Sequence, residues 1–139
     1  GFENLDVSNW NTSNITNMAA MFYHCRNLVT LNLSNWDTSK VEYMHYMFGD
    51  CTNLNNIDVS NFNTSNVTNM RTMFNACRSL TTLNVSNWVT SNVTDMEEMF
   101  DGCNKLESVS LSNWDTGAVT NMSAMFRSCT SLVELNVDN

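Results

Sequence analysis

Cysteines carry the most reactive side chains in this sequence, and their spacing is uniform. Equivalent residues of stacked coils lie about 4.8 Å apart, a separation that a disulfide tolerates, but their Cβ atoms would point in parallel, which is poor bridge geometry. The count is odd. We expect a ladder of buried free thiols that act as small hydrophobic side chains, with one or more disulfides as the alternative. The five recur every 26 residues: Cys25, Cys51, Cys77, Cys103 and Cys129.

Residues for metal binding or catalysis do not converge in the sequence. The two histidines, His24 and His45, occupy variable positions of the repeat, and no Cys-x-x-Cys pair is present. The adjacent pair Glu97-Glu98 is typical of a solvated face rather than of an acid/base couple. None of the four glycines belongs to a phosphate-binding loop. We therefore predict no metal, no cofactor and no enzymatic activity.

Composition excludes several classes of partner. The chain has 139 residues, a formal net charge of −8 and a pI near 4.4. This acidic balance argues against nucleic acid or an anionic membrane surface as partner. No apolar run approaches the roughly 18 residues of a membrane span, so we expect no membrane insertion of this segment. No signal peptide is recognisable, and Gly1 as the first residue is typical of an excised segment.

One unit of 26 residues repeats along the whole chain. A Met-Phe pair and an aromatic residue recur at the same interval as the cysteines, with no insertion. We therefore predict a single domain over residues 1–139. We expect the aromatic rings to stack inside a corner of the coil, with an exposed stripe for carbohydrate contact as the alternative. The aromatic column is Trp10, Trp36, Phe62, Trp88 and Trp114.

Two hydrophobic periods alternate within each unit. Apolar and polar residues alternate over residues 31–34, which indicates a half-buried strand. The next segment keeps helical spacing and starts at Asn17, a good N-cap that coil 2 replaces with Tyr43, a poor one. We predict an α/β repeat: a leucine-rich-repeat-like right-handed solenoid of about five coils, each with one short parallel strand and one short helix. The helical face comprises Ile15, Met18, Met21, Phe22 and Cys25.

The repeat resembles a known family. Its motif is S-N-W-D-T-S-x-V-T-N-M-x-x-M-F-x-x-C-x-x-L, which residues 112–132 follow except at Gly117. This motif is similar to the 26-residue bacterial surface-protein repeat, which includes mycoplasma lipoprotein-associated repeats and is related to BspA-like leucine-rich repeats. The resemblance covers the whole chain. It implies an extracellular location on a microbial cell surface, anchored through other parts of the parent protein, and a loose association with adhesion.

We expect a non-enzymatic binding module that recognises a host or cell-surface protein or glycan. A structural spacer without its own ligand is one alternative. Ice or crystal binding is another, through an outward threonine column that begins with Thr12, although the charges of Lys40 and Glu42 break that face. No polar capping repeat is visible at either end, so end-to-end self-association is also expected.

The strand face is where we expect a ligand to bind. Parallel strands, one per coil, align their outward residues into columns, and all of these side chains are short or acidic. One column begins at Ser8, repeats as serine every 26 residues and ends at Asp138. Such a surface lacks the Trp, Tyr and Arg anchors of tight interfaces, so it predicts weak binding per coil to a neutral or cationic polar ligand. The expected site comprises Thr30, Asn32, Asn56, Asp58, Thr82, Asn84, Ser108 and Ser110.

Overall fold

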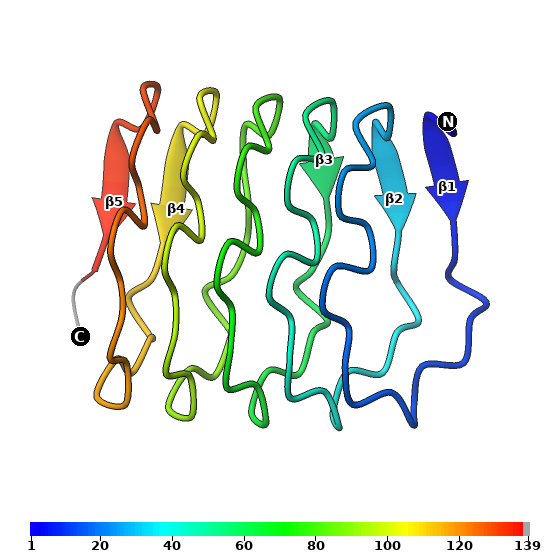
Figure 1. Ribbon diagram of the computed structural model, residues 1–139, viewed down its shortest axis with the longest axis horizontal. Helices are drawn as coiled ribbons and strands as arrows, with labels where there is room; N and C mark the ends of the chain where they lie inside the picture. The colour runs from blue at the N-terminus through cyan, green and yellow to red at the C-terminus, as the bar shows by residue number, and fades with distance from the viewer. Residues whose placement is uncertain (138–139) are drawn as a thin grey trace.

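The chain winds through successive coils that lie side by side along one axis, as the computed structural model in Figure 1 shows. The structure describes residues 1–137, so Asp138 lies outside the described residues. We number the coils from their strand position: coil 1 is residues 4–29, coil 2 is 30–55, coil 3 is 56–81, coil 4 is 82–107 and coil 5 is 108–133. The strands are β1 (Asn4–Asp6), β2 (Thr30–Asn32), β3 (Asn56–Ile57), β4 (Ser108–Ser110) and β5 (Glu134–Asn136).

The strands pair in parallel between neighbouring coils. Leu31 of β2 pairs with both Leu5 and Ile57 in the sheet β1-β2-β3, and β4 pairs with β5 in a second sheet. Coil 4 joins that second sheet only through a bridge between Thr82 and Ser108. Residues 26 apart therefore lie side by side, as the repeat predicts, but the sheet is interrupted between β3 and coil 4.

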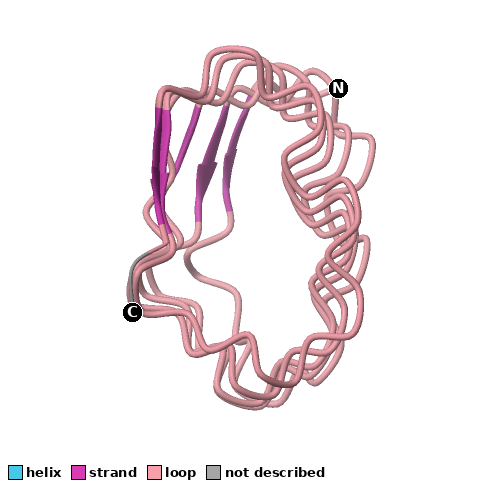
Figure 2. Cartoon of the chain, turned by 90° about the vertical axis from the view of Figure 1, so that its left-hand side faces the viewer, coloured by secondary structure: helices cyan, strands magenta, loops and turns pink. Residues whose placement is uncertain are grey.

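The predicted helix in each coil is wrong, and with it the α/β, leucine-rich-repeat-like class. Residues 1–137 contain no α-helix, and turns occupy the side of the coil opposite the strands (Figure 2). Within coil 1, the Met21 N–H bonds to the Met18 carbonyl, at 3.3 Å between N and O. The Phe22 N–H instead bonds to the Met47 carbonyl of coil 2, at 2.9 Å. In an α-helix, each N–H donates to the carbonyl four residues earlier in the same segment. Here every second N–H of the segment donates instead to a carbonyl of the next coil.

Left-handed backbone at two positions per coil produces these turns. Ala20 and His24 have φ of 56° and 62°, and the equivalent residues of the other coils also have positive φ. Turns that close over three residues bring side chains back to the same side at three- and four-residue intervals. That spacing matches a helix face, which is why the pattern was misleading. No helix of the described residues could cross a membrane.

The side chains that face the inside of the coil are those that the repeat predicts as core. The Met, Phe and Cys columns form the core together with the strand leucines and valines. The aromatic column is internal: Trp88 and Trp114 stack with ring centroids 6.4 Å apart and planes within 3°. Trp10, in coil 1, is half exposed and stacks on Trp36. The expected internal aromatic corner is confirmed for the buried members of the column: Trp36, Phe62, Trp88 and Trp114.

The threonine column points inward, contrary to the outward column expected. The Thr38 hydroxyl donates to the Asn63 carbonyl at 3.0 Å and accepts from the Asn63 N–H at 2.8 Å. Because each hydroxyl is fully used by the backbone of the next coil, it offers nothing to an ice or crystal surface. The buried members are Thr12, Thr38, Thr64 and Thr90.

Candidate functional site

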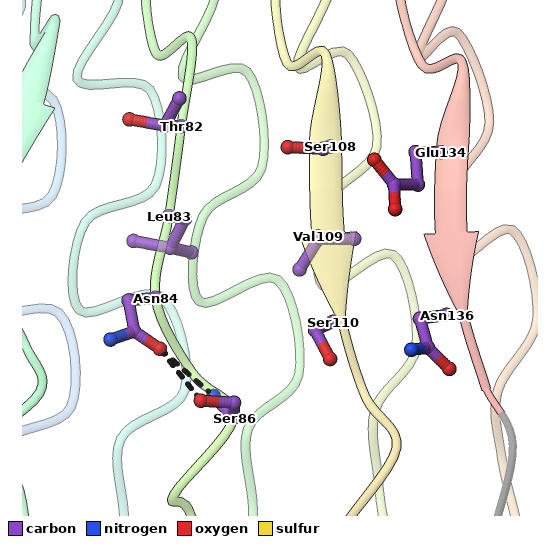
Figure 3. A pocket seen from close by; sticks show the side chains of 9 residues that line it. All are labelled: Thr82, Leu83, Asn84, Ser86, Ser108, Val109, Ser110, Glu134 and Asn136. Carbon is purple, nitrogen blue, oxygen red and sulfur yellow. Dashed lines mark hydrogen bonds between the residues drawn. The ribbon is translucent and has the colours of Figure 1, made fainter.

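Two shallow hollows lie on the strand face. The first, of about 430 Å³, lies over β1, β2 and β3. The second, of about 320 Å³, lies over coil 4, β4 and β5. Figure 3 shows the second, with Thr82, Ser108 and Glu134 in one row across the coils and Asn84 and Ser110 in the next.

The structure divides the predicted site between these hollows. Each hollow contains four of the eight predicted residues. Those four come from neighbouring coils and lie side by side because the strands are in register. The gap in the sheet between β3 and coil 4 separates the two groups of four. Thr30, Asn32, Asn56 and Asp58 line the first hollow, and Thr82, Asn84, Ser108 and Ser110 line the second.

Local hydrogen bonds orient the polar groups of this face. Asp58 Oδ1 accepts from the Ser60 N–H at 3.0 Å and from its hydroxyl at 2.6 Å. Asn84 Oδ1 accepts in the same way from Ser86, at 3.3 Å and 2.8 Å (Figure 3). The bonds from Ser60 lower the pKa of Asp58, so this carboxylate is charged at neutral pH.

The strand face offers hydrogen-bonding groups, and its charged side chains are carboxylates. The two hollows contain hydroxyls, amides and the carboxylates of Asp6, Asp58 and Glu134, and no basic side chain lines them. No group of three or more His, Cys, Asp or Glu in residues 1–137 is placed to hold a metal ion. The arrangement suits a neutral or cationic polar ligand that contacts several coils at once.

The cysteines are free and belong to the core rather than to a site. All five are unbridged, which resolves the thiol or disulfide alternative in favour of thiols. Each inner thiol donates to the carbonyl 29 residues earlier, as Cys77 does to Phe48 at 3.2 Å between S and O. Burial raises the pKa of Cys51 to about 12 and raises the pKa of Cys77 and Cys103 as well. Protonated, shielded thiols are poor nucleophiles.

The turn face carries a cluster that the sequence analysis did not single out. Tyr23 of coil 1 contacts His24 beside it and also lies against Tyr46 of coil 2, with the Tyr23 and Tyr46 centroids 5.3 Å apart. Tyr43 and His45 continue the cluster within coil 2. The signal was present: every tyrosine and histidine of the chain falls between residues 23 and 46. The histidines were interpreted one at a time as solvated residues, so their common location was missed.

An ionic network flanks this cluster. Asp50 Oδ2 accepts from His24 Nδ1 at 2.6 Å and from Arg26 Nε at 2.7 Å. Burial of Asp50 opposes its ionisation, but the bonds from Arg26 and His24 outweigh it and lower the pKa of the carboxyl. On the other flank, Arg71 Nε lies 3.1 Å from Glu97 Oε2.

Comparison with known proteins bears on the family alone. A family model described as Mycoplasma protein of unknown function, DUF285, matches residues 1–83 and residues 75–139. No curated protein and no solved structure matches the chain. The match confirms a mycoplasma-type repeat family and does not extend to BspA-like leucine-rich repeats. With both matches together covering residues 1–139, the chain belongs to the DUF285 family of Mycoplasma proteins.

Proposed function

We propose that this chain is a non-enzymatic binding module that contacts a polar, neutral or cationic ligand through its strand face. One observation carries the proposal: outward hydroxyl, amide and carboxylate groups occupy equivalent, registered positions in neighbouring coils. A ligand with its own repeating polar groups, such as a glycan or an extended protein segment, can bond to several coils at once. Weak contacts add up to useful affinity in this way.

The setting proposed for this binding is a microbial cell surface. Support comes from the resemblance of the motif to bacterial surface-protein repeats, including the mycoplasma lipoprotein-associated and BspA-like groups. The partner would be a host or cell-surface protein or glycan, and other parts of the parent protein would supply the anchor. Adhesion is the activity that such a surface serves best.

A charge-insertion pair tests the strand face. Asn56→Lys with Asn84→Lys places one lysine in each hollow, and binding to immobilised matrix proteins and neutral or amino oligosaccharides should fall at least about tenfold. Asn66→Lys with Asn92→Lys is the matched control, because Lys40 already occupies that column on another face. Equal binding by both variants, with the fold intact by circular dichroism, would exclude the strand face as the site.

A stiff spacer is the second candidate function. Internal bonds link consecutive coils throughout the stack, as Trp88 Nε1 does in donating to the Val59 carbonyl at 3.1 Å. A continuous ladder of this kind resists bending and suits a stalk. If wild type and both lysine variants bind none of the probes, the spacer function is favoured.

End-to-end association of the 139-residue chain is part of the proposal. At the β5 end, a hollow of about 390 Å³ is lined mainly by apolar side chains, among them Leu111, Trp114 and Phe126. At the β1 end, Phe2 is exposed and the edge of β1 is open. Apolar ends and open strand edges pair with one another. Sedimentation velocity over a rising concentration series should show a growing weight-average mass, and a constant monomer mass would contradict it.

A further inference from the structure

An aromatic ridge stands on the turn face of coils 1 and 2. Tyr23 and Tyr43 are 41% and 40% exposed, although each has neighbours within the ridge. The ring planes cross steeply, at 66° between Tyr23 and Tyr46 and 75° between His45 and Tyr46. The crossed rings pack edge to face and form a raised surface rather than a flat platform. We define the aromatic ridge by its members: Tyr23, His24, Tyr43, His45 and Tyr46.

Coil 2 breaks the rule of the repeat at Tyr43. The other four coils carry Asn or Asp at this position, and its Oδ1 accepts the N–H two residues ahead, as Asn69 does from Arg71 at 2.9 Å. This Asx turn fixes the start of the turn segment. A tyrosine cannot accept the bond, so coil 2 lacks a stabilising contact that the other coils have. Positions that break a local rule without structural gain are where function is expected.

Two further departures lie in the same coil. Every coil has positive φ at the position of Tyr46, but coil 2 alone places an aromatic residue there, at a φ of 59°, where a bulky side chain is strained. The Nδ1 atom of His45 is shielded from solvent and has no hydrogen-bond partner within residues 1–137. Three of the four residues 43–46 of coil 2 therefore carry features that folding alone does not favour, and all three belong to the ridge.

The surroundings of the ridge are basic in an otherwise acidic chain. The turn segments of coils 1–3, residues 17–28, 43–54 and 69–80, contain three arginines and one aspartate, whereas the whole chain carries −8. Arg26 and Arg71 pair with Asp50 and Glu97, and Arg78 is exposed. The equivalent segment of coil 4, residues 95–106, contains four carboxylates and one lysine. A ligand steered by charge would therefore approach coils 1–3 with negative groups.

We propose that the aromatic ridge is a docking surface for an acidic protein segment that also carries apolar side chains. Tyrosine and arginine are the residues that dominate binding energy at protein interfaces, and the chain concentrates them here. Apolar side chains of the partner pack against the exposed rings of Tyr23 and Tyr43, while the excess of positive charge, which includes the exposed Arg78, attracts its carboxylates. A sugar ring stacks best on a flat aromatic face, which the crossed rings do not provide. This surface is distinct from the strand face and takes ligands of opposite charge.

Variants drawn from the chain's own repeat can remove the ridge without introducing foreign residues. Tyr23→Asn, Tyr43→Asn and Tyr46→Ala restore side chains that other coils carry at the same positions, namely Asn75, Asn69 and Ala20. The triple variant keeps the core columns unchanged. Its midpoint of urea unfolding should be at or above that of wild type, so a loss of binding reports the ridge and not the fold.

The probe is a fluorescein-labelled 12-residue peptide in which Asp and Glu alternate with Leu and Phe, followed by anisotropy at low ionic strength. Wild type should bind it at least about tenfold more tightly than the triple variant and than a matched peptide with Lys for Asp and Glu. The strand-face variant Asn56→Lys with Asn84→Lys should bind the acidic peptide no less tightly than wild type, which separates this proposal from the strand-face one.

Three outcomes overturn the proposal. The first is equal affinity of the triple variant and wild type for the acidic peptide. The second is equal affinity of wild type for the acidic and lysine peptides. The third is tyrosine-dependent binding of a heparin dodecasaccharide with no binding of the acidic peptide, which would assign the ridge to an anionic glycan instead.

Discussion

The strand face and the turn face of this stack differ in how much they vary from coil to coil. On the strand face, one column contains Asp, Asn or Ser throughout: Asp6, Asn32, Asp58, Asn84, Ser110 and Asn136. On the turn face, one column alone spans five residue types: Ala19, His45, Arg71, Glu97 and Ser123. Both faces rest on the same core, so packing does not explain the difference. The comparison teaches that the turn face is free to change from coil to coil, whereas the strand face keeps one kind of side-chain chemistry.

What holds both faces in place is a set of internal bonds that repeat 25 or 29 residues apart. Trp36, Trp88 and Trp114 each donate an indole N–H to a carbonyl 29 residues earlier. Coil 3 has Phe62 instead, and there the Asn61 amide takes the place of the indole and donates to the Leu33 carbonyl at 3.1 Å. The core therefore compensates for its one deviant aromatic, whereas coil 2 leaves the deviant Tyr43 of the turn face uncompensated.

Truncating the shared core should have the largest effect. Phe74 is fully buried between Phe48 and Phe100, with which it stacks. We expect Phe74→Ala to lower the free energy of unfolding by about 3–5 kcal/mol in urea titration. Tyr23→Ala on the turn face is the control and should cost under about 1 kcal/mol. Similar losses for the two variants would erase the distinction between core and free face.

Removing one indole donor should have an intermediate effect. Trp88→Phe keeps an aromatic ring but leaves the Val59 carbonyl without the 3.1 Å bond from Nε1. The Val59 carbonyl still accepts the Phe62 N–H at 3.1 Å, so the loss of this one hydrogen bond should lower the free energy of unfolding by about 0.5–1.5 kcal/mol. Phe62→Trp, the reverse change, should cost little, because Leu33 is already served by Asn61. If Trp88→Phe is neutral, the neighbouring Asn87 amide has moved to Val59, as Asn61 has done in coil 3.

The buried thiols should make stability fall in alkaline solution. Burial raises the pKa of Cys77 above its ordinary value of 9.0, so the folded state holds this proton more tightly than the unfolded state. The stabilisation is complete below pH 9 and is lost as the pH rises above it. Between pH 8 and pH 10 wild type should lose about 1 kcal/mol more than Cys77→Ala, measured by urea unfolding at both pH values. Parallel losses would indicate that Cys77 is accessible to solvent.

The sequence was sufficient for everything that depends on recurrence. Its 26-residue period gave the strand register, and its apolar columns gave the core. It misled wherever a residue's partner is the backbone of the next coil. An extended segment would turn Thr38 outward, but its hydroxyl instead bonds to a carbonyl and an N–H of coil 3. Helical spacing from Met18 to Cys25 arose from turns, since periodicity does not reveal which carbonyl an N–H will reach.

The candidate sites divide in the same way. The eight strand-face residues lie where recurrence predicts, although the gap after β3 splits them into two groups. The aromatic ridge consists of single deviations from the repeat, which a search for fixed columns discards. Finding it from sequence requires asking which coils break the pattern and whether the breaks are adjacent. In this chain Tyr43, His45 and Tyr46 are adjacent, and Tyr23 and His24 lie beside them one coil away.

The smallest predicted effect is the change in stability on replacing Tyr43, and it tests whether the tyrosine at this position serves function or structure. Tyr43→Asn restores the side chain of Asn17, Asn69 and Asn121, whose Oδ1 atoms each accept the N–H two residues ahead. A restored cap should raise the free energy of unfolding by about 1 kcal/mol, measured by urea titration. Asn69→Ala, which removes the same cap from coil 3, should lower it by a similar amount.

Together the two variants give opposite signs at equivalent positions, which excludes a general effect of mutating the turn. If Tyr43→Asn raises stability and weakens binding of the acidic peptide, the turn face of coil 2 sacrifices stability for recognition, as many binding sites do. If Tyr43→Asn instead lowers stability, the tyrosine ring is part of the fold. In that case the variation on the turn face reflects packing between Tyr43 and its neighbours, and the contrast with the strand face loses its functional meaning.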